Sequence, residues 1–443
     1  MMPLSGNGVE PPKTRTRMPP KKRTIGWVCT TYFAEGLPFM IVRILSGVFF
    51  TQIGVKERYL GYLNFLGLPW NIKFLWAPLV DGWGTKRGWQ VALQALLGAL
   101  TAAVALLAHF AGGAAEPAHF FEAIAGVFVL MAIVAATNDI AIDGYYLEAL
   151  PKREDQALYS GYRVLAYRMA MVFARSGLVA FAAWSVGTVT SGSVYDGWCL
   201  AFGVGAITLI GGAFLHSTLL PHSTIVHTQV ESQFAKARRV FVEGFKTYIA
   251  QPQVLITLIF IVLYKMGDEL LFSMVTPFML RELRVSAEQY ATIGGIVGAL
   301  GTIVGAMWGG WLIQKMGLKK ALWPLTIAMN ANIWLYIWLS IAKPDPLTTK
   351  GLSVIALIHG IEQIAAGLGS AALLVFLLGT CSREYRATHY AIGSAIMSIP
   401  GTIVGGYGGV IVEGIGYTGL YLMAFVASLP GMLLIPFVPI REE

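Results

Sequence analysis

Twelve apolar stretches, each long enough to cross a membrane, limit the possible folds of this chain more than any other feature. A membrane-spanning helix needs about 20 predominantly apolar residues. The twelve stretches, numbered here as predicted helices 1 to 12, lie near residues 25–50, 59–80, 88–110, 121–147, 158–187, 197–220, 253–280, 288–314, 319–342, 351–379, 387–412 and 416–438. Only 13% of the residues are charged, which excludes an ordinary soluble domain. We therefore predict an all-α membrane protein with 12 transmembrane helices.

The Lys and Arg residues outside these stretches predict how the chain is oriented. Twenty of them lie on the side of the two tails, and six lie on the other side. Basic residues collect in cytoplasmic loops, so both termini are expected in the cytoplasm. The net charge of +8 then reflects membrane topology. The expected partners are the lipid bilayer, protons and a small anionic cargo, and no nucleic acid is expected.

Repeats and linkers divide the chain into two similar halves. LVDGWGTKR at 79–87 is echoed by LIQKMGLKK at 312–320, and GTIVGAMWGG at 301–310 is echoed by GTIVGGYGGV at 401–410. Two six-helix halves built from triplets are the major facilitator pattern. The predicted parts are a basic cytoplasmic tail at 1–24, six-helix bundles at 25–220 and 253–438, a linker at 221–252 and a short tail at 439–443. The linker should contain an amphipathic surface helix with Phe234, Val240, Phe241 and Phe245 on its apolar side.

Ionisable residues inside the apolar stretches point to a functional cavity. The stretch ATNDIAIDGYY in predicted helix 4 places Asp139 and Asp143 one turn apart, although a carboxylate at membrane depth costs about 2.5 kcal/mol or more. In the major facilitator arrangement, helices 1, 4, 7 and 10 line the cavity and helices 3, 6, 9 and 12 face lipid. Apart from Lys319 and Lys320 at the very start of helix 9, the last four contain no Asp, Glu, Lys or Arg in their apolar stretches. This agreement supports the fold prediction.

Four buried acids are candidates for carrying a proton: Asp139, Glu35, Asp268 and Glu362. No nucleotide-binding motif is present, so uptake against a gradient would need an ion gradient. Asp139 is favoured, because Arg168 on the neighbouring helix could pair with its ionised form, whereas Asp143 is close to the cytoplasmic surface. A permanent interhelical salt bridge is the alternative role for any one of these residues.

Cations and aromatic side chains near mid-membrane are candidates for cargo binding: Lys73, Arg168, Lys265, Tyr167, Tyr264, Trp70, Trp76 and His359. They would suit a small anionic cargo with rings. A second group, at the cytoplasmic side, is predicted to form a gating charge lock: Asp81, Lys86, Arg87, Asp143, Glu148 and Arg163. For the scattered aromatic residues, ordinary packing is the alternative role.

Other classes of protein find little support in the sequence. The three cysteines lie in three different predicted helices, and no metal-binding spacing occurs, so neither a metal nor a cofactor is expected. No catalytic motif of a hydrolase, kinase or zinc enzyme is present, so we do not expect an enzyme. A non-transporting membrane sensor or scaffold stays open as an alternative, although no signalling domain accompanies it. We expect a monomer.

Several motifs resemble the muropeptide permease (AmpG) branch of the major facilitator superfamily. They are ATNDIAIDGYYLEAL, FAEGLP, KFLWAPLVD, AYRMAM, YKMGDE, GGWLIQKMG, SREYRATHYAIGSA and SLPGMLLIPFV, which together cover nearly the whole chain. The branch includes importers of anhydromuropeptides and of ferric siderophores and transporters of acetyl-CoA. The resemblance therefore implies proton-coupled import across a bacterial inner membrane, with anhydromuropeptide as the first expected cargo and a ferric siderophore as the alternative.

Overall fold

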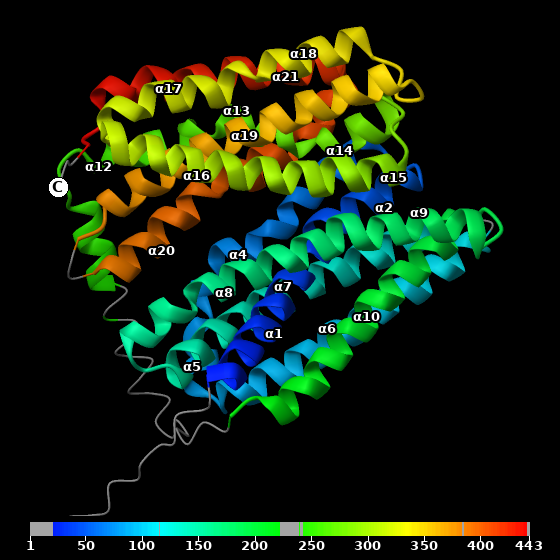
Figure 1. The fold of residues 1–443 in the computed structure, drawn as a ribbon, viewed down its shortest axis with the longest axis horizontal. Coiled ribbons are helices and arrows are strands. Elements are labelled where there is room, and N and C mark those ends of the chain that lie inside the picture. The colour runs from blue at the N-terminus through cyan, green and yellow to red at the C-terminus, as the bar shows by residue number, and fades with distance from the viewer. Residues whose placement is uncertain (1–20, 115, 222–238, 240–241, 383–384, 441–443) are drawn as a thin grey trace, which may run out of the picture.

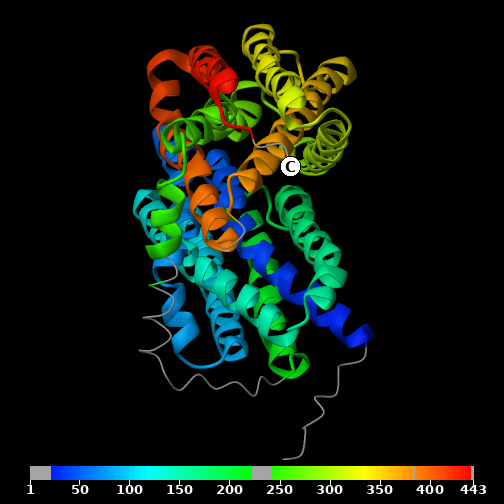
Figure 2. The ribbon, with the colours of Figure 1, turned by 90° about the vertical axis from the view of Figure 1, so that its left-hand side faces the viewer.

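The computed structural model describes residues 21–440 except 115, 222–238, 240–241 and 383–384. In this part of the chain every regular element is a helix. The helices form two bundles that lie against each other, one from each half of the sequence (Figure 1). Figure 2 shows the same two bundles from the side on which the C-terminus lies. The all-α fold predicted from the apolar stretches is thus confirmed.

All six predicted helices of the first half are present. Helix 1 begins at α1 and continues without a break, and helix 2 is divided into short pieces. The elements are α1 (Lys21–Met40), η1 (Ile41–Leu45), α2 (Ser46–Gln52), α3 (Glu57–Tyr62), η2 (Leu63–Gly67), α4 (Leu68–Ile72), η3 (Lys73–Leu75), α5 (Ala77–Gly82), α6 (Lys86–Gly112), α7 (Ala118–Ala149), α8 (Arg153–Val172), η4 (Phe173–Leu178), α9 (Val179–Thr188) and α10 (Val194–Leu219).

The second half repeats this arrangement. Its elements are α12 (Val254–Tyr264), α13 (Met266–Ser273), α14 (Val275–Pro277), η5 (Phe278–Glu282), α15 (Ala287–Tyr290), η6 (Ala291–Val297), α16 (Gly298–Met316), α17 (Leu318–Ala331), α18 (Ile333–Ala342), α19 (Thr349–Gly379), α20 (Arg386–Met397), η7 (Pro400–Val404), α21 (Gly408–Leu434) and η8 (Ile435–Phe437). Gly416, with φ of 71°, separates predicted helices 11 and 12 inside α21. Glycine adopts this left-handed conformation at little cost.

Three of the predicted membrane helices, 2, 7 and 11, are interrupted. Nine helices of the described chain are long and apolar enough to cross a membrane. Predicted helices 2, 7 and 11 are not among these nine, because each of them is divided into shorter pieces. Pro69 and Pro78 begin new helical pieces in helix 2, and Pro400 begins η7 in helix 11. Proline lacks the N–H that continues a helix. Irregular backbone at membrane depth is tolerated where protein surrounds it, and these breaks lie at the functional site described below.

The linker returns to the bundle through a short helix at residues 242–249. Its Tyr248 packs edge-on against His389 of α20 with the ring centroids 5.0 Å apart, and the Thr247 hydroxyl lies 3.0 Å from His389 Nε2. Phe245, predicted to lie on the apolar side of a surface helix, is 46% exposed. Phe234, Val240 and Phe241 lie outside the described residues. We call the end of the bundle that holds this helix and the start of α1 the linker end, and the other end, with the α2–α3 connection, the opposite end.

A seam of small residues joins the two halves toward the opposite end. Gly61 of helix 2 lies so close to Gly409 of helix 11 that a Cβ on Gly61 would be 2.6 Å from the Gly409 nitrogen. A Cβ on Gly409 would in turn overlap the Glu57 carbonyl oxygen. One turn further on, the Asn64 amide donates to the Gly405 carbonyl oxygen at 3.1 Å. Helices 2 and 11 can therefore touch along their backbones only with glycine at these positions.

The substitution Gly409→Leu is expected to force this seam apart, because backbone atoms of helix 2 occupy the space that the new side chain needs. A cysteine at Asn64 reports on the opening of the seam. In the Gly409→Leu variant we expect it to react with a membrane-impermeant maleimide at least tenfold faster than in the matched control variant. The control is Gly414→Leu in the same helix, where an added Cβ meets nothing within 4 Å. Equal labelling rates in the two variants would show that the seam does not depend on Gly409.

Candidate functional site

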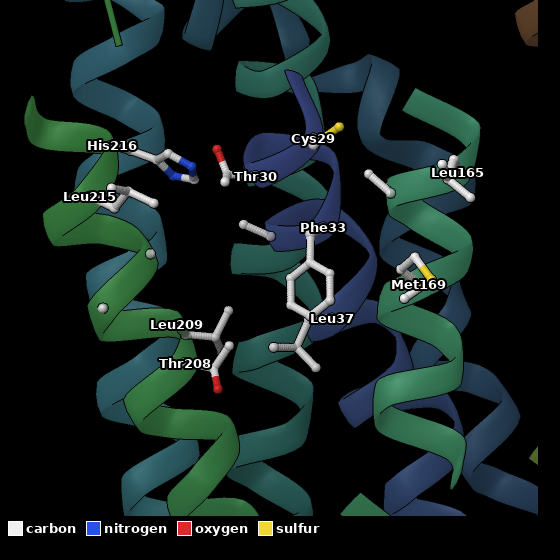
Figure 3. Close-up of a pocket in the computed structure, with 14 residues that line it drawn as sticks. Cys29, Thr30, Phe33, Leu37, Leu165, Met169, Thr208, Leu209, Leu215 and His216 are labelled. Carbon is white, nitrogen blue, oxygen red and sulfur yellow. The ribbon is translucent and has the colours of Figure 1, made fainter. Parts of the chain in front are cut away.

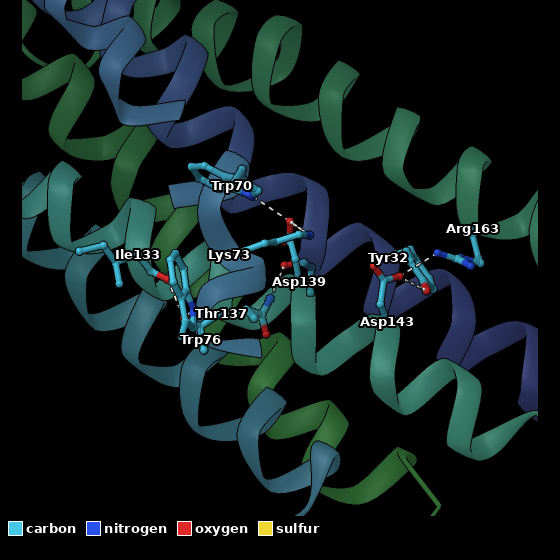
Figure 4. Close-up of polar contacts among 11 residues, drawn as sticks. Tyr32, Trp70, Lys73, Trp76, Ile133, Thr137, Asp139, Asp143 and Arg163 are labelled. Atoms are coloured by element: carbon cyan, nitrogen blue, oxygen red, sulfur yellow. Dashed lines mark hydrogen bonds and ion pairs between the residues drawn. The ribbon is translucent and has the colours of Figure 1, made fainter. Parts of the chain in front are cut away.

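Asp139 lies at the centre of a charged cluster in the first half. Its Oδ2 accepts a hydrogen bond from Trp70 Nε1 at 2.8 Å and lies 3.6 Å from Lys73 Nζ (Figure 4). Its Oδ1 is buried without a hydrogen-bond partner in the described structure. Lys73 begins the short helix η3, so the break in helix 2 places the ammonium group beside α7. The Lys73 side chain remains 33% exposed and can reach a solute.

The predicted pairing of Asp139 with Arg168 is not formed in this structure. The Arg168 guanidinium instead donates to the Met171 sulfur, 3.4 Å away on the same helix. The sequence correctly indicates that the two residues lie on neighbouring helices. It does not show which face of each helix is turned toward the other. Lys73 therefore takes the place that was expected for Arg168 at the acid.

Asp143 forms a second group one turn nearer the linker end. Its Oδ1 accepts hydrogen bonds from the Tyr32 hydroxyl at 2.9 Å and from Arg163 at 2.8 Å (Figure 4). The Arg163 guanidinium also lies over the rings of Tyr32 and Tyr146, at 4.3 and 4.4 Å from their centroids. Cation–π contacts of this kind strengthen an ion pair. The structure thus brings together two of the predicted gating residues, Asp143 and Arg163.

The other predicted gating residues have different surroundings. Lys86 is buried, and its side chain lies against Gly144 of α7. Arg87 donates to the Ser217 carbonyl of α10, so it is directed away from the predicted lock. Glu148 is half-buried near the end of α7, and the Asp81 side chain lies outside what the structure describes.

Glu35 adds a third acid to the cluster in the first half. It interacts electrostatically with Asp139, Asp143 and Lys73, and its Oε2 is buried without a hydrogen-bond partner in the described chain. Among the described residues, the ion pairs of the acids Glu35, Asp139 and Asp143 are those with Lys73 and Arg163. With every group ionised the cluster would carry one excess negative charge, and one proton would balance it.

A similar cluster occupies the break between α12 and α13 in the second half. Lys265 Nζ lies 3.3 Å from Asp268 Oδ2 and 3.2 Å from Glu269 Oε1. The Lys265 and Glu269 side chains are 17% and 29% exposed, whereas Asp268 is buried. Both clusters therefore place a partly accessible lysine beside two or more acids.

Three predicted site residues of the second half are enclosed in its core. Tyr264 is fully buried and donates its hydroxyl to the Gly369 carbonyl at 3.1 Å. His359 and Glu362 are both 0% exposed, with His359 Nδ1 2.8 Å from the Tyr336 hydroxyl and 3.7 Å from Glu362 Oε2. They lie on helices predicted to line the cavity, but their side chains face the core of the second half in this conformation. Cargo contacts of Tyr264 and His359 therefore remain a prediction.

The two predicted tryptophans and Tyr167 stay near the Asp139 cluster. Trp76 Nε1 donates to the hydroxyl of Thr137, two residues before Asp139 on α7, at 3.1 Å. Phe39 packs against both Trp70 and Tyr167, with ring centroids 5.0 and 6.5 Å apart. These aromatic side chains are only partly buried, so they can offer a surface to a ring.

The sequence did not single out Asn71, which bridges the two halves between the clusters. Its amide nitrogen donates to the Thr402 hydroxyl at 2.9 Å, and its amide oxygen accepts from the Ser398 hydroxyl at 2.8 Å. It stands two residues before Lys73, and Gly401, beside Thr402, packs against Glu269. Asn71 thus connects the surroundings of Lys73 with those of Lys265. The sequence offered one sign of this role, namely its position between Pro69 and Lys73 within a predicted membrane helix.

Arginine residues at the opposite end were also missed as functional candidates. Arg281 of η5 donates to the Thr51 carbonyl at 2.6 Å, to the Val55 carbonyl at 2.7 Å and to Glu57 at 2.9 Å, all in the first half. Arg58 pairs with Glu413 across the same interface at 2.6 Å. These contacts and the glycine seam close the two halves against each other at the opposite end.

Two pseudo-symmetric helical bundles, with broken helices and paired charges between them, define a multi-pass membrane transporter of the alternating-access type. The sequence model of the Major Facilitator Superfamily matches residues 65–364 of this chain. The chain therefore belongs to this superfamily. The anhydromuropeptide permease of Escherichia coli strain K12 is 29% identical over 411 residues, which cover 91% of this chain and 77% of that protein. An uncharacterized protein of Haemophilus influenzae is 26% identical over 420 residues, covering 93% of this chain and 94% of that protein. The predicted resemblance to the muropeptide permease branch is thereby confirmed.

Solved structures of transporters share the fold at low sequence identity. A point mutant of the nucleoside transporter NupG superimposes with a TM-score of 0.65 at 14% identity, covering 93% of this chain and 99% of that chain. A D-xylose–proton symporter gives a TM-score of 0.65 at 13% identity, covering 94% and 98%. These similarities concern the fold and leave the cargo to be argued from the site. The relatives are permeases and transporters, as expected for a protein that is not an enzyme.

Proposed function

We propose that the protein is a proton-coupled importer of an anionic sugar–peptide of the anhydromuropeptide type. The observation that carries the proposal is the Asp139–Lys73 pair, in which a buried acid with one unpartnered oxygen holds a cation that is still 33% exposed. The permease of Escherichia coli, whose name states anhydromuropeptide as its cargo, supports this cargo class.

The pair offers a direct link between proton binding and cargo binding. A proton on Asp139 removes the charge that attracts Lys73, and the ammonium group can then turn to a cargo carboxylate. Release of the proton restores the pair and expels the anion. Each ligand thereby favours binding of the other, as linkage requires. Glu35 interacts electrostatically with both partners, so its charge also affects the balance of the pair.

The two clusters together suit a cargo with more than one carboxylate. Lys73 and Lys265 each remain partly exposed on their own half, and Asn71 joins the surroundings of the two. Trp70, Trp76 and Tyr167 supply aromatic surface beside Lys73 for a sugar ring. Arg168 is a further cation on the same half, and no metal ligand is needed. A ferric siderophore, which carries its own iron ligands, would match the same charges less selectively.

A binding panel tests the cargo assignment. We expect purified protein to bind an anhydromuropeptide at least tenfold more tightly than a ferric siderophore of similar size. Lys265→Ala should weaken that binding about tenfold, because it removes one charged contact of about 1.5 kcal/mol. The matched control Lys320→Ala changes an exposed lysine at the linker end. Tighter binding of the siderophore would reverse the assignment, and unchanged binding by Lys265→Ala would make that lysine structural.

The linker end is proposed to face the cytoplasm and the protein to act as a monomer. Single cysteines at Lys246 in the linker helix and at Leu347, which is 89% exposed at the opposite end, test the orientation in a chain without its native cysteines. In intact cells an impermeant maleimide should label only the Leu347→Cys variant. Labelling of Lys246→Cys alone would place the termini outside and contradict the proposed direction of transport.

A further inference from the structure

A pocket of about 420 Å³ lies between α1, α8 and α10, away from the charged clusters (Figure 3). It is lined mainly by apolar side chains and by two adjacent glycines, Gly211 and Gly212. Phe33 of α1 lines it, whereas Glu35, two residues later, belongs to the cluster around Asp139. Consecutive helical residues are turned by about 100°, so two residues apart means nearly opposite faces. The pocket therefore lies on the outer side of α1.

The rim of the pocket is open to the surface that faces lipid. Leu165 and Met169 of α8 are 58% and 55% exposed, and Leu215 of α10 is 42% exposed. All three lie in helices long enough to cross the membrane. Along α1 the lining runs from Cys29 to Leu37, a length of about 12 Å. One leaflet of a bilayer has a hydrocarbon layer of about 15 Å, so the pocket has the length of one leaflet.

The end of the pocket nearest the linker end is polar. His216 lines it, is fully buried, and holds its Nδ1 2.6 Å from Gln94 Oε1. Its Nε2 has no hydrogen-bond partner in the described structure, and Figure 3 shows the ring pointing from α10 toward Thr30 of α1. Because Gln94 Oε1 accepts from Nδ1, Nε2 is a buried acceptor, which is costly unless a donor pairs it. A bound molecule that brings a donor, or a water held by it, would pair it at this depth.

Two arginines lie one turn further toward the linker end. Arg23 donates to the Leu219 carbonyl at 3.4 Å, and Arg87 donates to the Ser217 carbonyl, both at the end of α10. The same side of the structure thus offers, in order of decreasing depth, an apolar pocket, a neutral polar atom and two guanidinium groups. A phospholipid has the same order of acyl chain, glycerol ester and phosphate.

We propose that this pocket is a specific binding site for a phospholipid of the leaflet at the linker end. One acyl chain fills the pocket, a water that donates to both His216 Nε2 and a glycerol ester oxygen joins these two acceptors, and the phosphate meets Arg23. The two arginines favour a headgroup with a net negative charge, so we commit to phosphatidylglycerol over zwitterionic lipids. This site is independent of the proposed cargo, because none of its residues belongs to the two charged clusters.

Native mass spectrometry of the detergent-purified protein tests the site with phosphatidylglycerol and phosphatidylcholine of the same acyl chains. The variant Gly211→Leu should fill the pocket, since an added Cβ there meets nothing within 4 Å, and the control Gly203→Leu on the same helix is equally open but outside the pocket. We expect one phosphatidylglycerol to be retained by the parent and by Gly203→Leu, and at least fivefold less by Gly211→Leu.

The headgroup is tested in the same experiment. Arg23→Gln should abolish the preference for phosphatidylglycerol over phosphatidylcholine. The variant should still retain one lipid, because the acyl chain can still occupy the pocket. Melting temperatures of all variants show that the protein is folded. Equal retention by Gly211→Leu and Gly203→Leu would mean that only unspecific surface lipid is bound, which overturns the proposal. Equal retention of the two lipids by the parent would overturn the assignment of an anionic headgroup.

Discussion

Asp139→Asn is expected to abolish proton-driven accumulation of cargo while leaving the fold intact. Asparagine keeps the shape of the side chain and can still accept the Trp70 hydrogen bond, but it cannot exchange a proton. With one proton per cargo molecule, a gradient of one pH unit stores about 1.4 kcal/mol, enough for about tenfold accumulation. In proteoliposomes the parent should approach that ratio, and the variant should stay near equal concentrations inside and outside.

Counterflow separates loss of coupling from loss of folding. Exchange of labelled for unlabelled cargo without a gradient needs no net proton movement, so Asp139→Asn should retain it. The exposed loop residue Asp345 provides the control Asp345→Asn, which should accumulate cargo as the parent does. If Asp139→Asn still accumulates cargo in a pH-dependent way, the coupling role moves to Glu35, Asp268 or Glu362. If it melts far below the parent, Asp139 is a permanent structural clamp.

The second large effect is expected for Arg281→Ala, at the closed opposite end. The guanidinium pairs with Glu57, with the Val55 carbonyl and with the Thr51 carbonyl at the end of helix 1, where the helix dipole is negative. Removing a charged network that is about a quarter exposed should cost about 2 kcal/mol. The ratio of closed to open conformations at this end should then fall about 30-fold.

Spin labels on both halves measure this shift. Cysteines at Ser191 and Leu347, in loops at the opposite end, report the separation of the halves by double electron–electron resonance. The parent should show one short distance, and Arg281→Ala should show an added longer one. Lys350→Ala, an exposed lysine at the same end, is the control and should leave the distribution unchanged. An unaltered distribution in Arg281→Ala would show that the Arg281 contacts are not needed to keep this end closed.

The sequence allowed most of the fold to be predicted. The lengths of the apolar stretches, and the absence of charged residues from the helices that face lipid, can both be read along the chain without knowing which helices touch. Breaks in helices 2, 7 and 11 were less evident, since a run of apolar residues has the same hydropathy whether its backbone is continuous or interrupted. Pro69, Pro78 and Pro400 were the available signs. The break in helix 2 matters because it places Lys73 beside Asp139 of α7.

The site could be predicted only in part, because helix membership does not determine which face a residue occupies. Asp139 and Asp143 were expected among charged residues, and in the structure they contact Lys73 and Arg163 respectively. Tyr264 and His359 lie on the expected helices but point into the core of the second half. Arg168 was expected to pair with Asp139, yet the irregular backbone at η3 gives that position to Lys73.

The most direct test of proton-coupled import is uptake of a labelled anhydromuropeptide by proteoliposomes that contain only the parent protein. With the inside more alkaline than the outside by one pH unit, we expect accumulation of about tenfold above the external concentration for one proton per cargo molecule. A proton-conducting ionophore should abolish it. Uptake that stops at equal concentrations whatever the pH gradient would contradict the account.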